Sequence, residues 1–198
     1  MGRAFTEEEK VKIKADIMET ALDLFHDKGT KSLNIAELTR RVGIAQGSFY
    51  NFWSDKDSLI IDLIAYRSAQ KLKGMEKEFS NSLTDPIGFL AEMVCRYYLD
   101  LVIKVRRKPI YEDAFKIFKA KKRDEVNGIE KPYREFLTKL INYWQENSAV
   151  KNVDKKGLDN ALIGCLLLCS EYYRFDEEYF EDILKTYVSG TAAKYIEL

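Results

Sequence analysis

Hydrophobic residues recur every three or four positions along most of the chain, the spacing that gathers them on one face of an α-helix. In the N-terminal part this pattern predicts helices over about 7–28, 35–42 and 45–52. Further helices are predicted over about 55–79, from Pro86 through Leu101, around 111–118, and over about 131–147, 158–169 and 177–191. The dipeptide Asn127-Gly128 predicts a turn. Because no segment shows the alternation of a strand, we expect an all-α protein.

The segment from Asn34 to Phe52 carries its own start and stop signals. Asn34 can cap a helix by accepting hydrogen bonds from the first free amides, and Glu37 is spaced to bond back to the amide of the cap. Gly43 follows the last periodic residue, where glycine tolerates a left-handed backbone. Two short helices joined by such a turn form a helix-turn-helix, whose second helix enters the DNA major groove.

The second of these short helices has an aromatic inner face and a polar outer face. Phe49 and Phe52 are its expected buried residues. Outward glutamine, asparagine and serine can read base edges, and tyrosine can donate to a phosphate. Gly47 removes a side chain where the helix would press against the duplex. For Gln46 or Asn51 alone, a solvated helix face is an equally simple explanation.

The next helix is expected to begin after Ser54, which we interpret as its cap with Asp57 at the third helical position. Lys56 then lies in the first turn, where the helix dipole disfavours a cation unless an anion such as a phosphate binds there. The alternative is a lysine that only points into water.

Residues 34–56, N-I-A-E-L-T-R-R-V-G-I-A-Q-G-S-F-Y-N-F-W-S-D-K, resemble the DNA-binding domain of the tetracycline-repressor-like family of bacterial regulators. By resemblance, the second short helix reads bases, and Tyr50 and Lys56 contact phosphates. The chain departs from the family pattern at Thr39, Ala45 and Trp53, and Ala45 removes a capping serine. The DNA-binding residues expected are Asn34, Gln46, Gly47, Ser48, Tyr50, Asn51 and Lys56.

The resemblance implies two domains and a homodimer. Residues 1–53 would form a three-helix DNA-binding domain and residues 54–198 a helical ligand-binding and dimerisation domain, with the helix over about 55–80 bridging the two. The last two long helices would pair with their copies in a second subunit, although burial within one subunit explains their apolar character too. The dimer residues expected are Leu162, Leu166, Phe180, Ile183, Leu184, Tyr187 and Val188.

The resemblance also implies a small-molecule cavity in the second domain. Aromatic residues are dense between Phe89 and Tyr173, and aromatic side chains line many ligand pockets, although they also serve as ordinary core. An apolar or aromatic, weakly charged ligand is the hypothesis. The pocket residues expected are Met93, Tyr97, Tyr111, Phe115, Phe136, Trp144 and Cys165.

Charge and cysteine content limit the class of nucleic-acid binding and the cellular compartment that we expect. The 32 basic residues equal the 32 acidic ones, which argues against a nonspecific nucleic-acid coating protein. A local group of cations can still steer the protein to DNA: Lys28, Lys31, Arg40, Arg41 and Lys56. Three cysteines do not suggest a disulfide framework, and with no secretory signal they indicate a reducing cytoplasm. The apolar run over residues 161–170 is too short to cross a membrane.

The resemblance implies a transcriptional repressor that a small-molecule ligand releases from a near-palindromic operator. No catalytic constellation, cofactor motif or metal spacing is evident, and a lone His26 is not a metal site. We therefore expect neither an enzyme nor a metal or cofactor. Two alternatives stay open: a helical interaction protein that has lost DNA binding, and a redox-responsive regulator using Cys165 and Cys169, which lie one helical turn apart.

Overall fold

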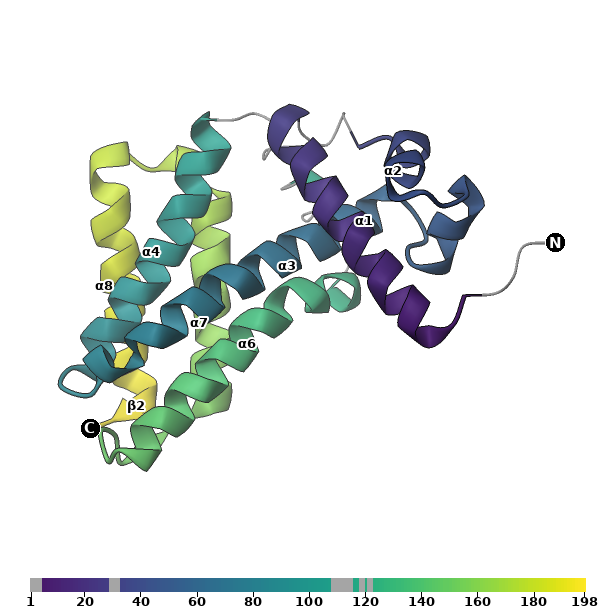
Figure 1. The fold of residues 1–198 in the computed structure, drawn as a ribbon. Helices are drawn as coiled ribbons and strands as arrows, with labels where there is room; N and C mark the ends of the chain where they lie inside the picture. Colours follow the sequence, from purple (N-terminus) through teal and green to yellow (C-terminus); the bar gives the residue numbers. More distant parts are fainter. Residues whose placement is uncertain (1–4, 29–32, 108–115, 118–119, 121–122) are drawn as a thin grey trace. The chain divides into compact units, whose positions relative to one another are not determined.

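The computed structural model describes residues 5–28, 33–107, 116–117, 120 and 123–198, and for residues 26–28, 101, 104–107 and 123–129 it describes the backbone alone (Figure 1). Apart from one short strand pair, the regular elements of the described residues are helices, as the hydrophobic spacing predicts. The elements are α1 (Glu7–Lys28), α2 (Ile35–Val42), the 3₁₀ helix η2 (Gln46–Asn51), α3 (Lys56–Met75), η3 (Glu76–Ser82), α4 (Pro86–Arg107), α6 (Arg123–Glu146), β1 (Asn152–Val153), α7 (Lys155–Ser170), η4 (Tyr172–Arg174), α8 (Glu177–Tyr195) and β2 (Ile196–Glu197).

The chain divides into two compact units. The N-terminal unit comprises residues 1–67 with 108–129, and the C-terminal unit comprises residues 68–107 with 130–198. The division therefore falls inside α3 and inside α6. By this grouping the N-terminal unit includes the first three turns of α3. The domain boundary expected after residue 53 from the sequence stays a prediction.

The N-terminal unit has its own hydrophobic core. Helix α1 contributes Ile17, Ala21 and Phe25, which recur at helical spacing and are all buried. Helix α2 adds Leu38 and α3 adds Leu59, each almost without exposed surface. Burying one such aliphatic side chain contributes about 1.5–3 kcal/mol, so this core holds together helices that are too short to be stable alone.

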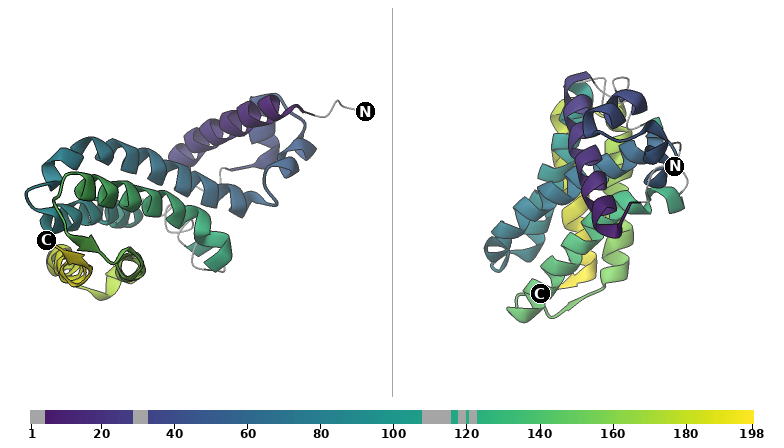
Figure 2. Two further views of the ribbon diagram at one scale, coloured as in Figure 1. Left: turned by 90° about the horizontal axis from the view of Figure 1, so that it is seen from below. Right: turned by 45° about the vertical axis from the view of Figure 1, so that its right-hand side comes forward.

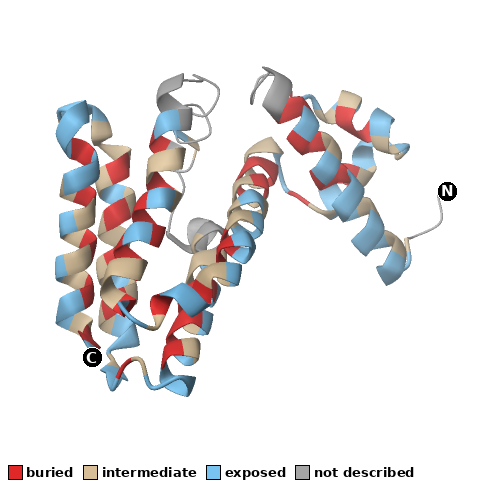
Figure 3. Cartoon of the chain, turned by 60° about the vertical axis from the view of Figure 1, so that its left-hand side comes forward, coloured by how far each residue is buried: buried red, intermediate tan, exposed pale blue. Residues whose placement is uncertain are grey.

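The C-terminal unit is a helical bundle with a larger core. Helix α4 packs against α7 and α8, and α7 and α8 lie side by side, as their end-on view in Figure 2 shows. Trp144 of α6 is fully buried and donates its indole N–H to Ser82 Oγ at 2.7 Å. Ser82 in turn donates to the carbonyl of Phe79 at 2.6 Å, so this buried polar pair is satisfied. Buried positions recur as stripes along the helices in Figure 3.

The structure differs from the sequence-based expectations at one strand pair and one turn. Strands β1 and β2 form a short antiparallel ladder that pairs Asn152 with Glu197 and Val153 with Ile196, where the sequence predicted no strand. Two residues are too few to leave an alternating pattern. The turn predicted at Asn127-Gly128 is also absent, because α6 begins at Arg123 and runs through Pro132. A turn dipeptide is a local preference, and a helix anchored by buried Phe136 and Leu140 overrides it.

Within the described residues, no helix combines the length and the apolar character needed to cross a membrane. The helix predicted around 111–118 falls almost wholly outside the described residues, as do the side chains of His26, Lys28 and Lys31.

Candidate nucleic-acid interface

Helix α2 begins where the sequence predicts, at a side-chain cap. Asn34 has an extended backbone, and its Oδ1 accepts hydrogen bonds from the amides of Ala36 and Glu37 at 2.9 and 3.2 Å. The cap satisfies two of the amides that a helix start otherwise leaves unpaired. This oxygen is therefore used in folding, and the contact of Asn34 with DNA stays a prediction.

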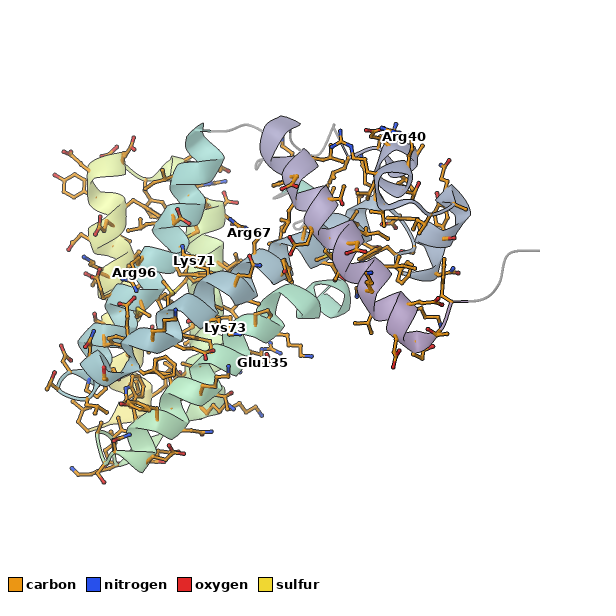
Figure 4. The ribbon with its side chains drawn as sticks, viewed as in Figure 1. Arg40, Arg67, Lys71, Lys73, Arg96 and Glu135 are labelled. Atoms are coloured by element: carbon orange, nitrogen blue, oxygen red, sulfur yellow. The ribbon has the colours of Figure 1, made fainter. Side chains whose placement is uncertain are left out.

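The Glu37 carboxylate does not complete the expected capping box and binds two arginines instead. Arg40 donates to it through Nε at 3.0 Å and Nη2 at 2.9 Å, and Arg41 donates through Nε at 2.7 Å. These hydrogen bonds, from Arg41 first and then Arg40, hold the pKa of the Glu37 carboxyl below its ordinary value. Charged donors one turn away outcompete a neutral amide. We call these three residues the Glu37–arginine cluster; Arg40 is labelled on the outer side of α2 in Figure 4.

The turn after α2 has the geometry that its glycine predicts. Gly43 adopts φ 79°, ψ 29°, a left-handed conformation, and its amide donates to the Arg40 carbonyl at 3.2 Å. The next amide, of Ile44, donates to the Thr39 carbonyl at 2.9 Å. Thr39 itself is buried, and its hydroxyl donates to the carbonyl of Ile35 at 2.8 Å. This departure from the family pattern therefore leaves no buried hydroxyl unsatisfied.

The expected recognition helix is a six-residue 3₁₀ helix, Gln46–Asn51, and the prediction of an α-helix over 45–52 is wrong. Ala45 precedes it with an extended backbone and makes no side-chain cap. A short helix without a cap tightens readily into 3₁₀ geometry. Phe49 is fully buried as predicted, but Phe52 is only half-buried.

Trp53, and not Phe52, is the second buried aromatic residue of this segment. It is 4% exposed, its ring lies 5.6 Å from the ring of Phe49, and its indole N–H donates to Asp62 Oδ2 at 2.9 Å. Lys14 of α1 lies over the same ring, 5.4 Å from the centroid, and 3.4 Å from Asp62. The family pattern has an aromatic residue at position 53, and this could have indicated that Trp53 is buried.

The buried aromatics of η2 leave its polar residues at the surface. Gln46, Gly47 and Asn51 are exposed, and Ser48 is half-buried. Tyr50 is 56% exposed, with its ring packed edge-on against Phe49 at 5.4 Å. A Cβ at Gly47 would have no heavy atom within 4 Å, so the backbone there is open. Thus η2 carries five of the seven predicted DNA-binding residues.

Helix α3 is capped by Asp55, and the prediction of Ser54 as its cap is wrong. Asp55 Oδ1 accepts from the amide of Ser58 at 2.7 Å and from its hydroxyl at 2.8 Å, while Ser54 hydrogen-bonds only side chains. The helix begins at Lys56, one residue later than the cap pattern implied, so Asp55 occupies the capping position. Lys56 is half-buried at this helix start. The Asp55 carboxylate already supplies the negative charge that the helix dipole favours at this end. The dipole therefore does not explain why a lysine stands at position 56.

The predicted pocket residues lie in or against the core of the C-terminal unit. Met93, Phe136, Trp144 and Cys165 are buried, and Tyr97 is half-buried; Tyr111 and Phe115 lie outside the described residues. The Tyr97 hydroxyl donates to Ser68 Oγ at 2.7 Å. Lys71 Nζ lies 5.1 Å from the Tyr97 ring and 2.9 Å from Asp100 Oδ2, reaching from α3 toward α4 (Figure 4).

The three cysteines are free and buried. Burial raises the pKa of Cys95 to about 11 and that of Cys165 to about 12, and it raises the pKa of Cys169 further. Because the thiolate is the reactive form, these thiols are poor redox sensors near neutral pH. The redox-responsive alternative therefore loses its support. Among the described residues no group of three potential ligands could hold a metal ion.

The predicted dimer residues fall into two groups. Four are buried in the core of their own unit, and three are half-buried. The buried four are Leu162, Phe180, Leu184 and Val188, and the half-buried three are Leu166, Ile183 and Tyr187. The most apolar stripe of α8 is thus covered by α4 and α7 of the same chain. Two large apolar residues on these helices were not singled out from the sequence: Leu167 on α7 and Tyr179 on α8, whose side chains are 63% and 57% exposed.

Comparisons with known proteins point to one family. Residues 17–63 match the sequence pattern of the family described as bacterial regulatory proteins, tetR family. The HTH-type transcriptional regulator AcrR of Shigella flexneri is 25% identical over 111 residues, 56% of this chain and 51% of that protein. The uncharacterized HTH-type transcriptional regulator YuxN of Bacillus subtilis is 36% identical over 50 residues, 25% of this chain and 17% of that protein. The chain thus spans about half of AcrR and less of YuxN.

Solved structures share the fold of this chain at low sequence identity. A TetR transcriptional regulator from Rhodococcus sp. RHA1 aligns with a TM-score of 0.62 and 16% identity, over 94% of this chain and 98% of that one. The regulator FadR from Bacillus subtilis, in complex with stearoyl-CoA, aligns with a TM-score of 0.53 and 16% identity, over 89% and 95% of the two chains.

Proposed function

We propose that this chain is a transcriptional regulator of the tetR family that binds double-stranded DNA sequence-specifically, because residues 17–63 match the pattern of that family. The observation that carries the proposal is the polar surface of η2, fixed in place by buried Phe49. Gln46 and Asn51 can each pair with an adenine edge, and Ser48 can contact either base type. Such a regulator works in the cytoplasm, where the DNA lies.

Contacts to the DNA backbone would come from residues beside this surface. Tyr50 can donate its hydroxyl to a phosphate, and Lys56 supplies a positive charge at the start of α3. Arg40 and Arg41 add two cations near the end of α2, the first helix of the motif, which crosses the DNA backbone in this class of proteins. Contacts of this kind set affinity and register, while the base contacts set specificity.

The regulator would bind as a homodimer. Two recognition helices related by a two-fold axis reach half-sites about 34–36 Å apart, so the operator should be nearly palindromic. Apolar side chains on α7 and α8 that keep exposed surface support this proposal. They are half-buried Leu166, Ile183 and Tyr187 and exposed Leu167 and Tyr179.

A small molecule would release the protein from its operator. The FadR structure holds stearoyl-CoA, so a protein of this fold can bind a ligand of that size. Release requires that the ligand bind one conformer more tightly than the other, because only differential affinity shifts the equilibrium. Helix α3, whose residues belong to both units, is the element that we expect to move.

Fluorescence anisotropy on DNA enriched from a random pool tests the proposal. The wild type should select a near-palindrome and should lose affinity steeply with added salt. Tyr50→Ala should weaken binding to every sequence, because the phosphate contact that it removes carries no sequence information. Tyr173→Ala, which removes a similarly exposed tyrosine of the C-terminal unit, is the matched control and should bind like the wild type. If no sequence is enriched and both variants match the wild type, the helical interaction protein becomes the better explanation.

A further inference from the structure

Among the described residues, one buried side-chain polar atom has no hydrogen-bond partner, the hydroxyl oxygen of Tyr133 on α6. An unpaired buried hydroxyl costs free energy, and the great majority of such groups in native proteins are paired. Two other tyrosines of the C-terminal unit follow this rule, since Tyr97 donates to Ser68 Oγ at 2.7 Å and Tyr187 donates to the Ala161 carbonyl at 2.6 Å. Nothing in the described part of the chain satisfies Tyr133.

Two tyrosine rings pack near Tyr133. Its ring centroid lies 6.2 Å from that of Tyr97 and 6.4 Å from that of Tyr98, and these two rings pack edge-on at 5.1 Å. Cys165 of α7 is fully buried close by. Burial raises the pKa of Tyr133 well above its ordinary value, so its hydroxyl keeps its proton and can donate it.

The charged groups beside these rings are paired with one another. Lys71 Nζ, 5.1 Å from the Tyr97 ring centroid, lies 2.9 Å from Asp100 Oδ2. Asp159 Oδ2 lies 3.2 Å from Arg134 Nε, and Arg134 Nη2 also binds Glu130 Oε2 at 2.6 Å. A ligand carboxylate or phosphate placed beside Tyr133 would lose its hydration without gaining a cation that is not already bound. A neutral polar group loses far less and can accept the tyrosine proton.

We propose that the Tyr133 hydroxyl anchors an uncharged, mostly apolar small molecule through one hydrogen bond, with Tyr97, Tyr98 and Cys165 around it. This inference rests on the proposed function, because it names the chemical class of the releasing ligand. A site of aromatic side chains with a single orienting polar group matches the usual composition of small-molecule sites. The site lies wholly within the C-terminal unit.

Equilibrium dialysis of the full chain against three probes of one ring size tests the inference: 2-naphthol, naphthalene and 2-naphthoate. The wild type should bind 2-naphthol roughly three- to tenfold more tightly than naphthalene, the effect of one net hydrogen bond. It should bind the anionic 2-naphthoate most weakly. No DNA is present, so a failure here is distinguishable from a failure to select an operator, which the anisotropy experiment measures separately.

Tyr133→Phe should abolish the preference for 2-naphthol and leave naphthalene binding unchanged. Tyr143→Phe is the matched control, because Tyr143 lies on the same helix but packs against Phe79 at 5.7 Å, and it should keep the preference. The inference is overturned if none of the probes binds the wild type, if 2-naphthoate binds best, or if Tyr133→Phe still prefers 2-naphthol. The last result would show that a group other than the Tyr133 hydroxyl makes the hydrogen bond to the probe.

Discussion

The two units differ in where their candidate functional groups lie, at the surface in one and in the interior in the other. In the N-terminal unit, Phe49 and Trp53 are buried, and the polar residues of η2 lie at the surface. In the C-terminal unit, the Tyr133 hydroxyl and all three thiols lie inside. The outward arrangement suits a large, charged partner such as DNA, whereas the inward one suits a small neutral partner. A surface that meets DNA can be rigid, but a buried site must open to admit its ligand.

The largest expected effect comes from removing the aromatic anchor of η2. Phe49→Ala should lower the free energy of unfolding by about 3–5 kcal/mol, the usual cost of deleting a fully buried phenylalanine side chain. It should abolish DNA binding even where the protein stays folded, because η2 loses its attachment. Denaturant unfolding and anisotropy measure the two effects. Leu140→Ala in the C-terminal core is the counterpart, destabilising by about 2–5 kcal/mol. If Leu140→Ala weakened DNA binding of the folded protein as much as Phe49→Ala, the contrast between the units would fail.

Alkaline pH should act on the C-terminal unit, which holds all three thiols. Burial raises the pKa of Cys95 to about 11 and that of Cys165 to about 12, from an ordinary value of 9.0. Above pH 9 the unfolded state releases these protons and the folded state keeps them, so stability falls as pH rises. The expected slope is on the order of 1 kcal/mol per pH unit per thiol. Denaturant unfolding between pH 9 and 10 measures it, and a variant with all three cysteines replaced by alanine should show a shallower slope.

The turn of the helix-turn-helix should depend on its glycine by a smaller amount. Gly43→Ala should cost about 1–2 kcal/mol, because φ is 79° and other L-residues are strained there. Gly47→Ala is the matched control. Neither position has an atom within 4 Å of a new Cβ, but only Gly43 has a positive φ. Thermal unfolding should therefore distinguish the two variants; equal melting temperatures would show that backbone strain at the turn is negligible.

The smallest expected effect concerns the Glu37–arginine cluster. Glu37→Gln should raise DNA affinity by roughly two- to fivefold and should steepen its salt dependence, because Arg40 and Arg41 would then bind phosphates without a competing carboxylate. Anisotropy over a series of salt concentrations measures both quantities. Glu135→Gln, which removes an exposed carboxylate of α6 (Figure 4), should change neither. Unchanged affinity in Glu37→Gln would mean that the arginines do not approach DNA.

The sequence was most informative where local rules and packing agree. The Asn34 cap, the Gly43 turn and the burial of Phe49 follow from residue type and helical spacing, and the structure confirms all three. The family resemblance placed η2 correctly, although not as an α-helix. The predictions of Ser54 as a cap and of Phe52 as a buried residue were wrong, because element ends read from sequence are uncertain by one or two residues.

The C-terminal unit was less predictable because its helices are apolar on several faces. Periodicity identified Leu162, Leu184 and Val188 as one apolar group but could not show whether α4 of the same chain or a second subunit covers them. Tyr133 was not singled out, since a tyrosine at helical spacing looks the same whether or not its hydroxyl is paired. The Glu37–arginine cluster was missed because the capping-box spacing and the i, i+4 ion-pair spacing both apply to Glu37.

The inaccessibility of the native cysteines makes selective chemical labelling of this protein straightforward. At neutral pH the three buried thiols should react slowly with maleimides, since burial keeps them protonated. A single cysteine introduced by Gly74→Cys on α3 would project into open space and react quickly. A fluorophore attached there would lie on the helix that we expect to move and outside the proposed DNA-contacting residues, while every native residue of the core was retained. Its emission would report operator binding and ligand-driven release in one continuous assay.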